Sequence, residues 1–217
     1  MIKKTCIAAA LAVLSMASVV HASALKDSPT LLALQHEWAH INYEVEKDQK
    51  EAAFASLAEK AHVWSSQNTG KVESLIWQAI IESSYAGAKG GLGALSLMEE
   101  ARDLLLKAES MEPAALNGSI YTSLGSFYYM TPGWPIGFGD DDKALEYLNK
   151  AMSIAPNDMD ANYFMGDYWL EEHKYKKATK YLQEVIDLPA VENRPIYSQG
   201  RKAEALAKLK MAKKHMH

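Results

Sequence analysis

Two alanines and a proline recur at a fixed spacing through the middle of the chain. In the first two copies the alanines are seven residues apart and the proline follows five residues later; in the third copy a valine replaces the second alanine and the proline comes one residue early. Small residues let helices approach closely, and proline stops a helix because it cannot continue the hydrogen-bond ladder. The pattern therefore predicts tandem helical units. The copies are Ala101, Ala108 and Pro113; Ala144, Ala151 and Pro156; and Ala178, Val185 and Pro189.

A second helical pattern precedes each copy, with a small or polar residue and an aromatic residue three positions later. The pairs are Glu82 with Tyr85, Gly125 with Tyr128, and Gly166 with Trp169. Over residues 75–190 the chain thus resembles the tetratricopeptide repeat (TPR) family, in which helix A carries the small residue and the aromatic and helix B carries the two alanines. The resemblance implies an all-α fold, an α-α superhelix of about eight to nine helices whose A helices line a concave groove.

The first two copies are longer than the third. The aromatic of helix A precedes the first alanine of helix B by nine residues in the third copy and by sixteen in the others, which indicates a seven-residue insertion in each A-to-B turn. The insertions are Gly-rich at 89–93 and rich in Pro and Gly at 131–139. Insertions at equivalent positions of an array emerge on the same edge. We therefore expect two long loops side by side at the edge of the groove.

The rest of the chain divides around this array. Residues 1–24 are interpreted as a signal peptide, 25–70 as a divergent N-terminal helical hairpin, 71–190 as three TPR-like repeats (71–113, 114–156 and 157–190), and 191–217 as a C-terminal capping helix and tail. The first hairpin is indicated by an apolar stripe that includes Leu34, Trp38 and Ile41. On the last helix the expected apolar stripe, which would shield the end of the array, is Ala203, Leu206, Leu209 and Ala212.

The N-terminus has the pattern of a secretory signal, so we expect a periplasmic or secreted protein. Lys3 and Lys4 precede an apolar run over 7–20, and residues 22–24 form an A-x-A cleavage site. The run is short for a membrane span, which predicts no membrane insertion after cleavage. The single cysteine, Cys6, lies at the front of this run, so neither a lipid anchor nor a disulfide is expected. Cleavage leaves 21 basic and 27 acidic residues, a formal charge of −6 that disfavours nucleic acid as a partner.

The string His36-Glu37-Trp38-Ala39-His40 matches the H-E-x-x-H pattern of zinc peptidases, in which two histidines bind metal and the glutamate activates water. A helical projection centred on Trp38 places His36 and His40 on the face opposite the apolar stripe. A catalytic zinc needs a third ligand and a sheltered cleft. The pattern is therefore interpreted as a chance pair on a solvated face, with a zinc metallohydrolase as the alternative.

The TPR resemblance carries the family's ligand-facing positions onto six residues. They are Ser83, Thr122, Ser126, Tyr129, Tyr163 and Asp167. This lining is small, polar and aromatic, and it lacks the basic cluster that would clamp a peptide carboxylate. It suits an extended peptide or a modest organic ligand.

The loop at 131–139 allows two interpretations. Trp134 and Phe138 could contact a ligand from a loop that its prolines stiffen, or they could pack against the core while one of the aspartates at 140–142 caps the following helix. A calcium site is disfavoured because the aspartates at 140–142 are consecutive, whereas calcium loops alternate their ligands.

Together these features predict a scaffold or adaptor that binds a protein segment or a small ligand, with no catalytic residues and no cofactor. An accessory role in solute transport is a further alternative. The sequence leaves the partner and the oligomeric state open.

Overall fold

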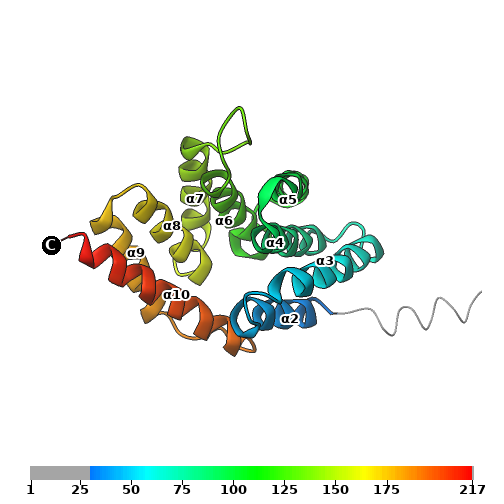
Figure 1. Cartoon of the computed structure of the whole chain (residues 1–217), viewed down its shortest axis with the longest axis horizontal. Coiled ribbons are helices and arrows are strands. Elements are labelled where there is room, and N and C mark those ends of the chain that lie inside the picture. Colours follow the sequence, from blue (N-terminus) through cyan, green and yellow to red (C-terminus); the bar gives the residue numbers. More distant parts are fainter. Residues whose placement is uncertain (1–29, 217) are drawn as a thin grey trace, which may run out of the picture.

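The computed structural model describes residues 30–216, and residues 1–24, where the signal peptide is predicted, lie outside them. The described part contains nine helices and no strand, which confirms the all-α, superhelical class (Figure 1). Within it no helix has both the length and the apolar character needed to cross a membrane. In chain order the helices are α2 (Leu31–Glu44), α3 (Lys50–Gln67), α4 (Val72–Lys89), α5 (Gly91–Met111), α6 (Ala115–Met130), α7 (Asp141–Ile154), α8 (Met159–Glu171), α9 (Tyr175–Asp187) and α10 (Pro195–Lys214).

Consecutive helices pack as hairpins, and two of the hairpins repeat the same close contact. A Cβ added at Gly125 of α6 would lie 2.7 Å from Cγ of Leu148 on α7, and one added at Gly166 of α8 would lie 2.8 Å from Cγ of Leu182 on α9. Both leucines are fully buried. Glycine therefore lets the two helices of each pair approach, as the spacing of small residues in the sequence indicates.

Side-chain caps begin several of these helices. Thr30, Asp140 and Asp158 each accept a hydrogen bond from the backbone N–H three residues later, at 2.9 to 3.1 Å. These caps satisfy backbone donors that have no partner inside the helix. At the start of α6 the backbone is left-handed over residues 116–118, and regular helix follows.

The C-terminal helix closes the arch formed by the other helices. Figure 1 shows α10 running beneath α8 towards α2, and α10 contacts α2, α8 and α9. One hydrophobic cluster accordingly joins residues of α2, α3 and α4 with residues of α8, α9 and α10, although these groups are far apart in the sequence. The approach to α2 requires Gly200, because a Cβ there would lie 2.3 Å from ring atoms of Tyr43.

The prediction for the buried face of α10 is partly wrong. Leu209 and Ala212 are buried as expected, but Ala203 and Leu206 are exposed. The buried stripe also includes Tyr197, Arg201 and Ala205. The helix is rotated relative to the expectation because it packs on α2 and α8 as well as on α9, so a wider face that includes a charged residue becomes buried.

The prediction of a long loop at 89–93 is also wrong. Gly90 alone separates α4 from α5, and residues 91–93 form the first turn of α5. The additional residues of this copy therefore lengthen the helices instead of forming a loop. Gly90 and Gly91 have positive φ angles of 64° and 65°, which allow the sharp reversal between the two helices.

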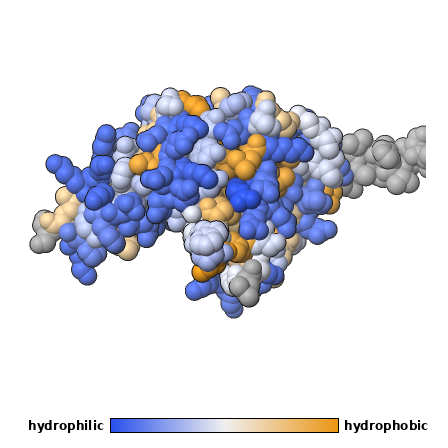
Figure 2. All heavy atoms as spheres, turned by 90° about the horizontal axis from the view of Figure 1, so that it is seen from above, coloured by the Kyte–Doolittle hydropathy of each residue, from blue (hydrophilic) through white to orange (hydrophobic). Residues whose placement is uncertain are grey.

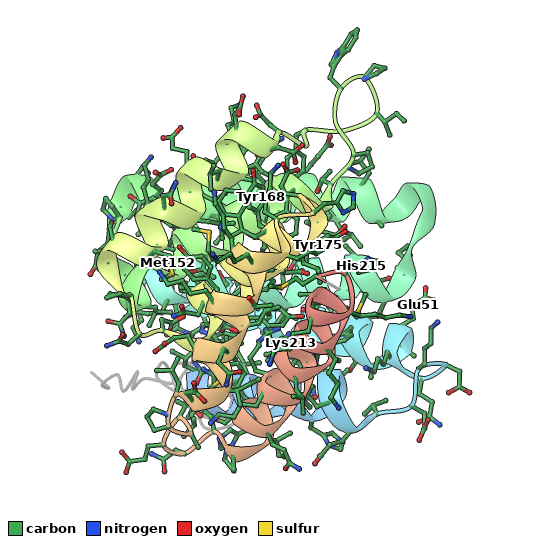
Figure 3. The ribbon with its side chains drawn as sticks, turned by 90° about the vertical axis from the view of Figure 1, so that its left-hand side faces the viewer. Glu51, Met152, Tyr168, Tyr175, Lys213 and His215 are labelled. Atoms are coloured by element: carbon green, nitrogen blue, oxygen red, sulfur yellow. The ribbon has the colours of Figure 1, made fainter. Side chains whose placement is uncertain are left out.

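The loop at 131–139 is present and projects from the body between α6 and α7 (Figures 1 and 3). Figure 2 looks onto the face from which it rises and shows apolar patches among mostly hydrophilic atoms. Trp134 is 90% exposed, whereas Phe138 packs edge-on against Tyr128 at 5.5 Å, with the guanidinium of Arg102 4.5 Å from its ring centre. Phe138 therefore packs against the body of the protein, whereas Trp134 is free to contact a ligand.

Candidate functional site

A cavity of about 550 Å³ lies inside the arch, between α4, the start of α5, α6, α8 and α10. Its wall is mainly apolar, and it opens beside the 131–139 loop, where Pro132 and Ile136 line it. Gly90 and Gly91 line it as well. The two segments predicted as insertions therefore meet at one edge of the molecule, as expected, although only one of them is a loop.

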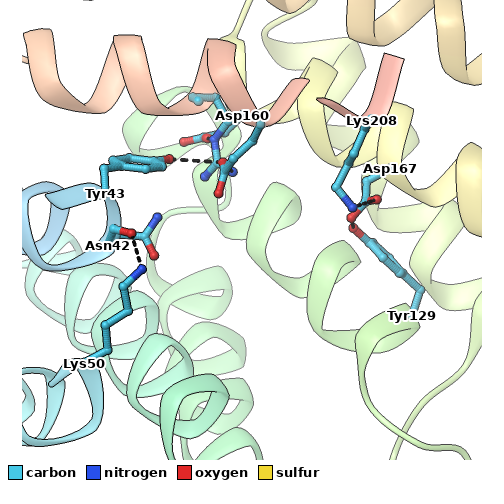
Figure 4. A network of polar contacts seen from close by, with 9 residues as sticks. Asn42, Tyr43, Lys50, Tyr129, Asp160, Asp167 and Lys208 are labelled. Atoms are coloured by element: carbon cyan, nitrogen blue, oxygen red, sulfur yellow. Dashed lines mark hydrogen bonds and ion pairs between the residues drawn. The ribbon is translucent and has the colours of Figure 1, made fainter. Parts of the chain in front are cut away.

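Polar residues gather where α10 and α2 meet the cavity. Arg201 is 6% exposed, and its guanidinium lies 4.2 Å from the ring centre of Tyr163. Its Nη1 donates to Oε2 of Glu204 at 2.7 Å, and its Nε lies 2.8 Å from Oδ1 of Asp160 in an ion pair without hydrogen-bond geometry. The hydroxyl of Tyr43 donates to the same Oε2 at 3.3 Å (Figure 4). Two carboxylates thus neutralise the buried cation.

These contacts set the protonation of the cluster. Burial acts to lower the pKa of Arg201, but the carboxylates of Asp160 and Glu204 and the neighbouring tyrosines outweigh it, so the guanidinium stays charged. Burial raises the pKa of Tyr163 and of Tyr43, which keeps both phenols protonated at neutral pH. The cluster can therefore orient a polar group through a charged guanidinium and two protonated phenols.

A second, more polar cavity of about 320 Å³ adjoins the first. The two share wall residues from five helices, and together they are called the interior space here, with the first as its apolar half and the second as its polar half. The shared residues are Trp38, Ser83, Ser84, Ser126, Phe127, Phe164 and Arg201.

The structure brings four of the predicted ligand-facing residues to this space. Ser83 and Ser126 line both halves, Tyr163 lines the apolar half and Thr122 lines the polar half. Trp134 lies outside both halves.

Tyr129 and Asp167 face a separate recess of about 340 Å³, which Lys208 of α10 also lines. The carboxylate of Asp167 is 2% exposed, pairs with the ammonium of Lys208 and accepts a hydrogen bond from the hydroxyl of Tyr129 at 3.0 Å (Figure 4). The resemblance assigned Asp167 to a ligand-facing position in an open groove. Lys208 of α10 already pairs with this carboxylate, so the groove is closed at this recess.

Sequence reasoning missed Arg201, Glu204 and Trp38 as residues of the interior space. The indole N–H of Trp38 donates to Oγ of Ser84 at 2.8 Å and thereby ties α2 to α4. Arg201 stands in the stripe that runs from Tyr197 through Ala205 to Leu209, at helical spacing. That spacing was the signal that could have identified it, since an arginine within an apolar stripe indicates a buried ion pair.

The H-E-x-x-H residues lie on the outer side of α2, each with a different partner. Nε2 of His36 is hydrogen-bonded to the backbone carbonyl of Asn193, Glu37 pairs with Lys60 at 2.6 Å, and Nδ1 of His40 lies 2.8 Å from Glu44. Within residues 30–216 no three His, Cys, Asp or Glu side chains form a group that could hold a metal ion. The metallohydrolase alternative therefore has no third ligand in the described part of the chain.

Comparison with protein-family models and with curated proteins found no match to this chain. The candidate site therefore depends on the geometry above and on the residue pattern.

Asp158, which lines the polar half and caps α8, predicts a pH dependence of stability. Burial and the neighbouring Asp160 raise the pKa of its carboxyl to about 6 from 3.8. The stability from this group is therefore complete below pH 3.8 and is lost as the pH rises to 6. Asparagine keeps the cap acceptor without the charge, so Asp158→Asn should stabilise the fold above this window by up to about 3 kcal/mol.

Urea unfolding at about pH 4 and about pH 7.5 measures this effect. The gain should shrink at the acid pH. Asp158→Ala serves as the control because it removes the charge and also the cap. It should therefore be about 1 kcal/mol less stable than Asp158→Asn at both pH values. A gain from Asp158→Asn that is the same at both pH values would contradict the assignment.

Proposed function

We propose that this protein is an exported, TPR-like binding protein that holds a small ligand in the interior space between α4, α6, α8 and α10, and that it acts by binding rather than catalysis. The observation that supports this proposal best is the cavity of about 550 Å³ with a mainly apolar wall and a fixed polar cluster. Small-molecule sites are typically concave, mostly apolar spaces of about 300–1,000 Å³ with a few placed polar groups. The cavity matches that description.

The position of α10 favours a small ligand over a protein segment. In the TPR-like interpretation a partner's extended segment would lie along the concave face, but α10 contacts α2 and α8 across that face. Its side chains already engage Tyr163 through Arg201 and Asp167 through Lys208. A protein segment would have to displace a helix that buries Leu209 and Ala212. A molecule that fits beside α10 meets no such obstacle, and this also suits the alternative of a solute-binding accessory to transport.

Binding of the uncharged fluorophore N-phenylnaphthylamine tests the proposal. The purified mature chain should raise its fluorescence, because the dye brightens in an apolar site. Gly87 lies within α4, lines the cavity, and has no atom within 4 Å of the position that a Cβ would take. The Cβ of Gly87→Phe therefore meets no atom, and its ring should occupy part of the cavity and reduce dye binding at least about tenfold, a difference of about 1.4 kcal/mol.

Ala52→Phe is the matched control, because Ala52 is exposed on α3 and does not line the cavity. It should bind the dye like the unchanged protein. Both variants should keep a thermal midpoint close to that of the parent, and Gly87→Phe should be slightly more stable because glycine within a helix costs about 0.5–1 kcal/mol. Equal dye binding by the parent and by Gly87→Phe would refute the interior space as the site.

A further inference from the structure

We propose that the apolar half of this space selects an uncharged, largely aliphatic molecule that carries a hydroxyl or N–H group, and that it discriminates against carboxylates. This inference rests on the proposed binding function and adds the chemical class of the ligand. It follows from which polar groups of the wall already have partners.

Among the described residues, the wall of the apolar half has no free cation for an acidic ligand, whereas Arg194 lines only the polar half. Arg201 is the one basic residue among those that line the apolar half, and its guanidinium is held by Asp160 and Glu204. Lys50 lies nearby but outside the lining, and its ammonium donates to the backbone carbonyl of Asn42 at 2.6 Å. A carboxylate entering the cavity would lose its water and gain no ion pair, which is unfavourable in an apolar site.

The hydroxyl groups of the serines in the wall already donate hydrogen bonds to backbone carbonyls. The hydroxyls of Ser83 and Ser84 donate to the carbonyl of Ile80 at 2.9 and 2.8 Å, and that of Ser126 donates to the carbonyl of Ser123 at 2.8 Å. A hydroxyl that donates to backbone keeps lone pairs that can accept. Ser83 and Ser126 therefore present acceptors to the cavity, which suit a ligand that donates.

Two further polar atoms of the wall can bind a ligand: a carboxylate oxygen of Glu204, and the hydroxyl oxygen of Thr131 near the mouth of the cavity. The contacts of Glu204 to Arg201 and Tyr43 both use Oε2, so Oε1 is available to accept. Thr131 lines the cavity and is 8% exposed, yet its Oγ1 is buried and has no hydrogen-bond partner in the described chain. A buried polar atom without a partner costs about 1–3 kcal/mol, so a ligand group that binds it would recover that free energy.

The rest of the wall is apolar and sets the body of the ligand. Leu95, Met98, Phe127 and Phe164 line the cavity with the methyl groups of Ala86 and Ala94. Burial of an aliphatic chain against such side chains is favourable, and the free energy gained increases with the apolar area that is buried. Met130 and Ile136 continue this surface outward and are 55% and 66% exposed, so the apolar wall reaches the entrance.

Displacement of bound N-phenylnaphthylamine by three compounds that share a ten-carbon chain tests the selectivity. Decanol donates a hydrogen bond, methyl decanoate only accepts, and decanoate is an anion at about pH 7.5. Decanol should displace the dye at the lowest concentration and methyl decanoate at an intermediate one. Decanoate should require a concentration at least about tenfold higher than decanol.

Glu204→Gln identifies the source of the discrimination. The change removes a negative charge from the wall, so the concentration of decanoate needed to displace the dye should fall at least about fivefold relative to that of decanol. Decanoate displacing the dye as well as decanol does from the unchanged protein would overturn the proposed ligand class. The same holds if none of the three compounds displaces a dye that Gly87→Phe excludes, and in both cases the interior site itself would stand. If Gly87→Phe does not exclude the dye, the proposed function fails instead.

Discussion

Replacing Arg201 with leucine should lower the free energy of unfolding by about 3–5 kcal/mol, because it leaves two carboxylates without their cation. Arg201 is 6% exposed, and it links Asp160 of α8 to Glu204 of α10 while its guanidinium covers Tyr163. Leucine restores part of the buried apolar area but neutralises neither acid. Urea unfolding followed by circular dichroism measures the change.

Two comparisons separate the charge from the packing. Lys210→Leu changes an exposed residue of the same helix and should alter stability by less than about 0.5 kcal/mol. Adding Asp160→Asn and Glu204→Gln to Arg201→Leu removes the uncompensated charges and should recover part of the loss. If the triple variant is less stable than Arg201→Leu alone, the unpaired carboxylates are not the cause of the loss.

Leu148→Ala should cost about 2–5 kcal/mol, the second of the large effects, because it opens a cavity where α6 meets α7. Leu148 is fully buried, and its Cγ lies 2.7 Å from the position of a Cβ at Gly125. Gly125→Ala alone should also destabilise the fold, by about 1–3 kcal/mol, since the added methyl forces the leucine to move. The two substitutions alter the same contact between α6 and α7, one from each helix.

Combining the two substitutions should therefore cost less than the sum of the single effects. The methyl introduced at position 125 would occupy part of the space that the leucine vacates, and residues in contact commonly show coupling of about 0.5–3 kcal/mol. The equivalent pair, Gly166→Ala with Leu182→Ala, is the matched test in α8 and α9. Strict additivity in both pairs would contradict the view that the two hairpins share one packing rule.

Closure of the arch by α10 changes which residues can function. The resemblance assigned Tyr163 and Asp167 to an open ligand-facing surface, but α10 places Arg201 against the first and Lys208 against the second. At the far end of α10, Figure 3 shows His215 beside Tyr175, and their rings stack at 4.9 Å, so the helix is held along its length. The accessible part of the groove is therefore the interior space near α4 and α6, which opens beside the 131–139 loop and is lined by Ser83 and Ser126.

The sequence alone determined the helical class, the hairpin order and the positions of the small residues in the helix pairs. These are local properties, because the spacing of Gly125, Ala144 and Ala151 along the chain sets which residues share a helix face. The outward placement of His36 and His40 followed from the same periodicity. Capping of α7 by one of the aspartates at 140–142 also followed from the sequence, since a cap and the backbone N–H that donates to it lie within one turn.

Tertiary structure alone decided the ion-pair partner of Arg201 on α8, the closing role of α10 and the existence of the interior space. These depend on contacts between residues such as Tyr43 and Gly200, which are far apart in the sequence, and no local periodicity encodes where a curved array brings its ends together. The same reason explains the first insertion, where extra residues lengthened α4 and α5 instead of forming a loop. Spacing reports how many residues are added, whereas packing decides whether they continue a helix or leave it.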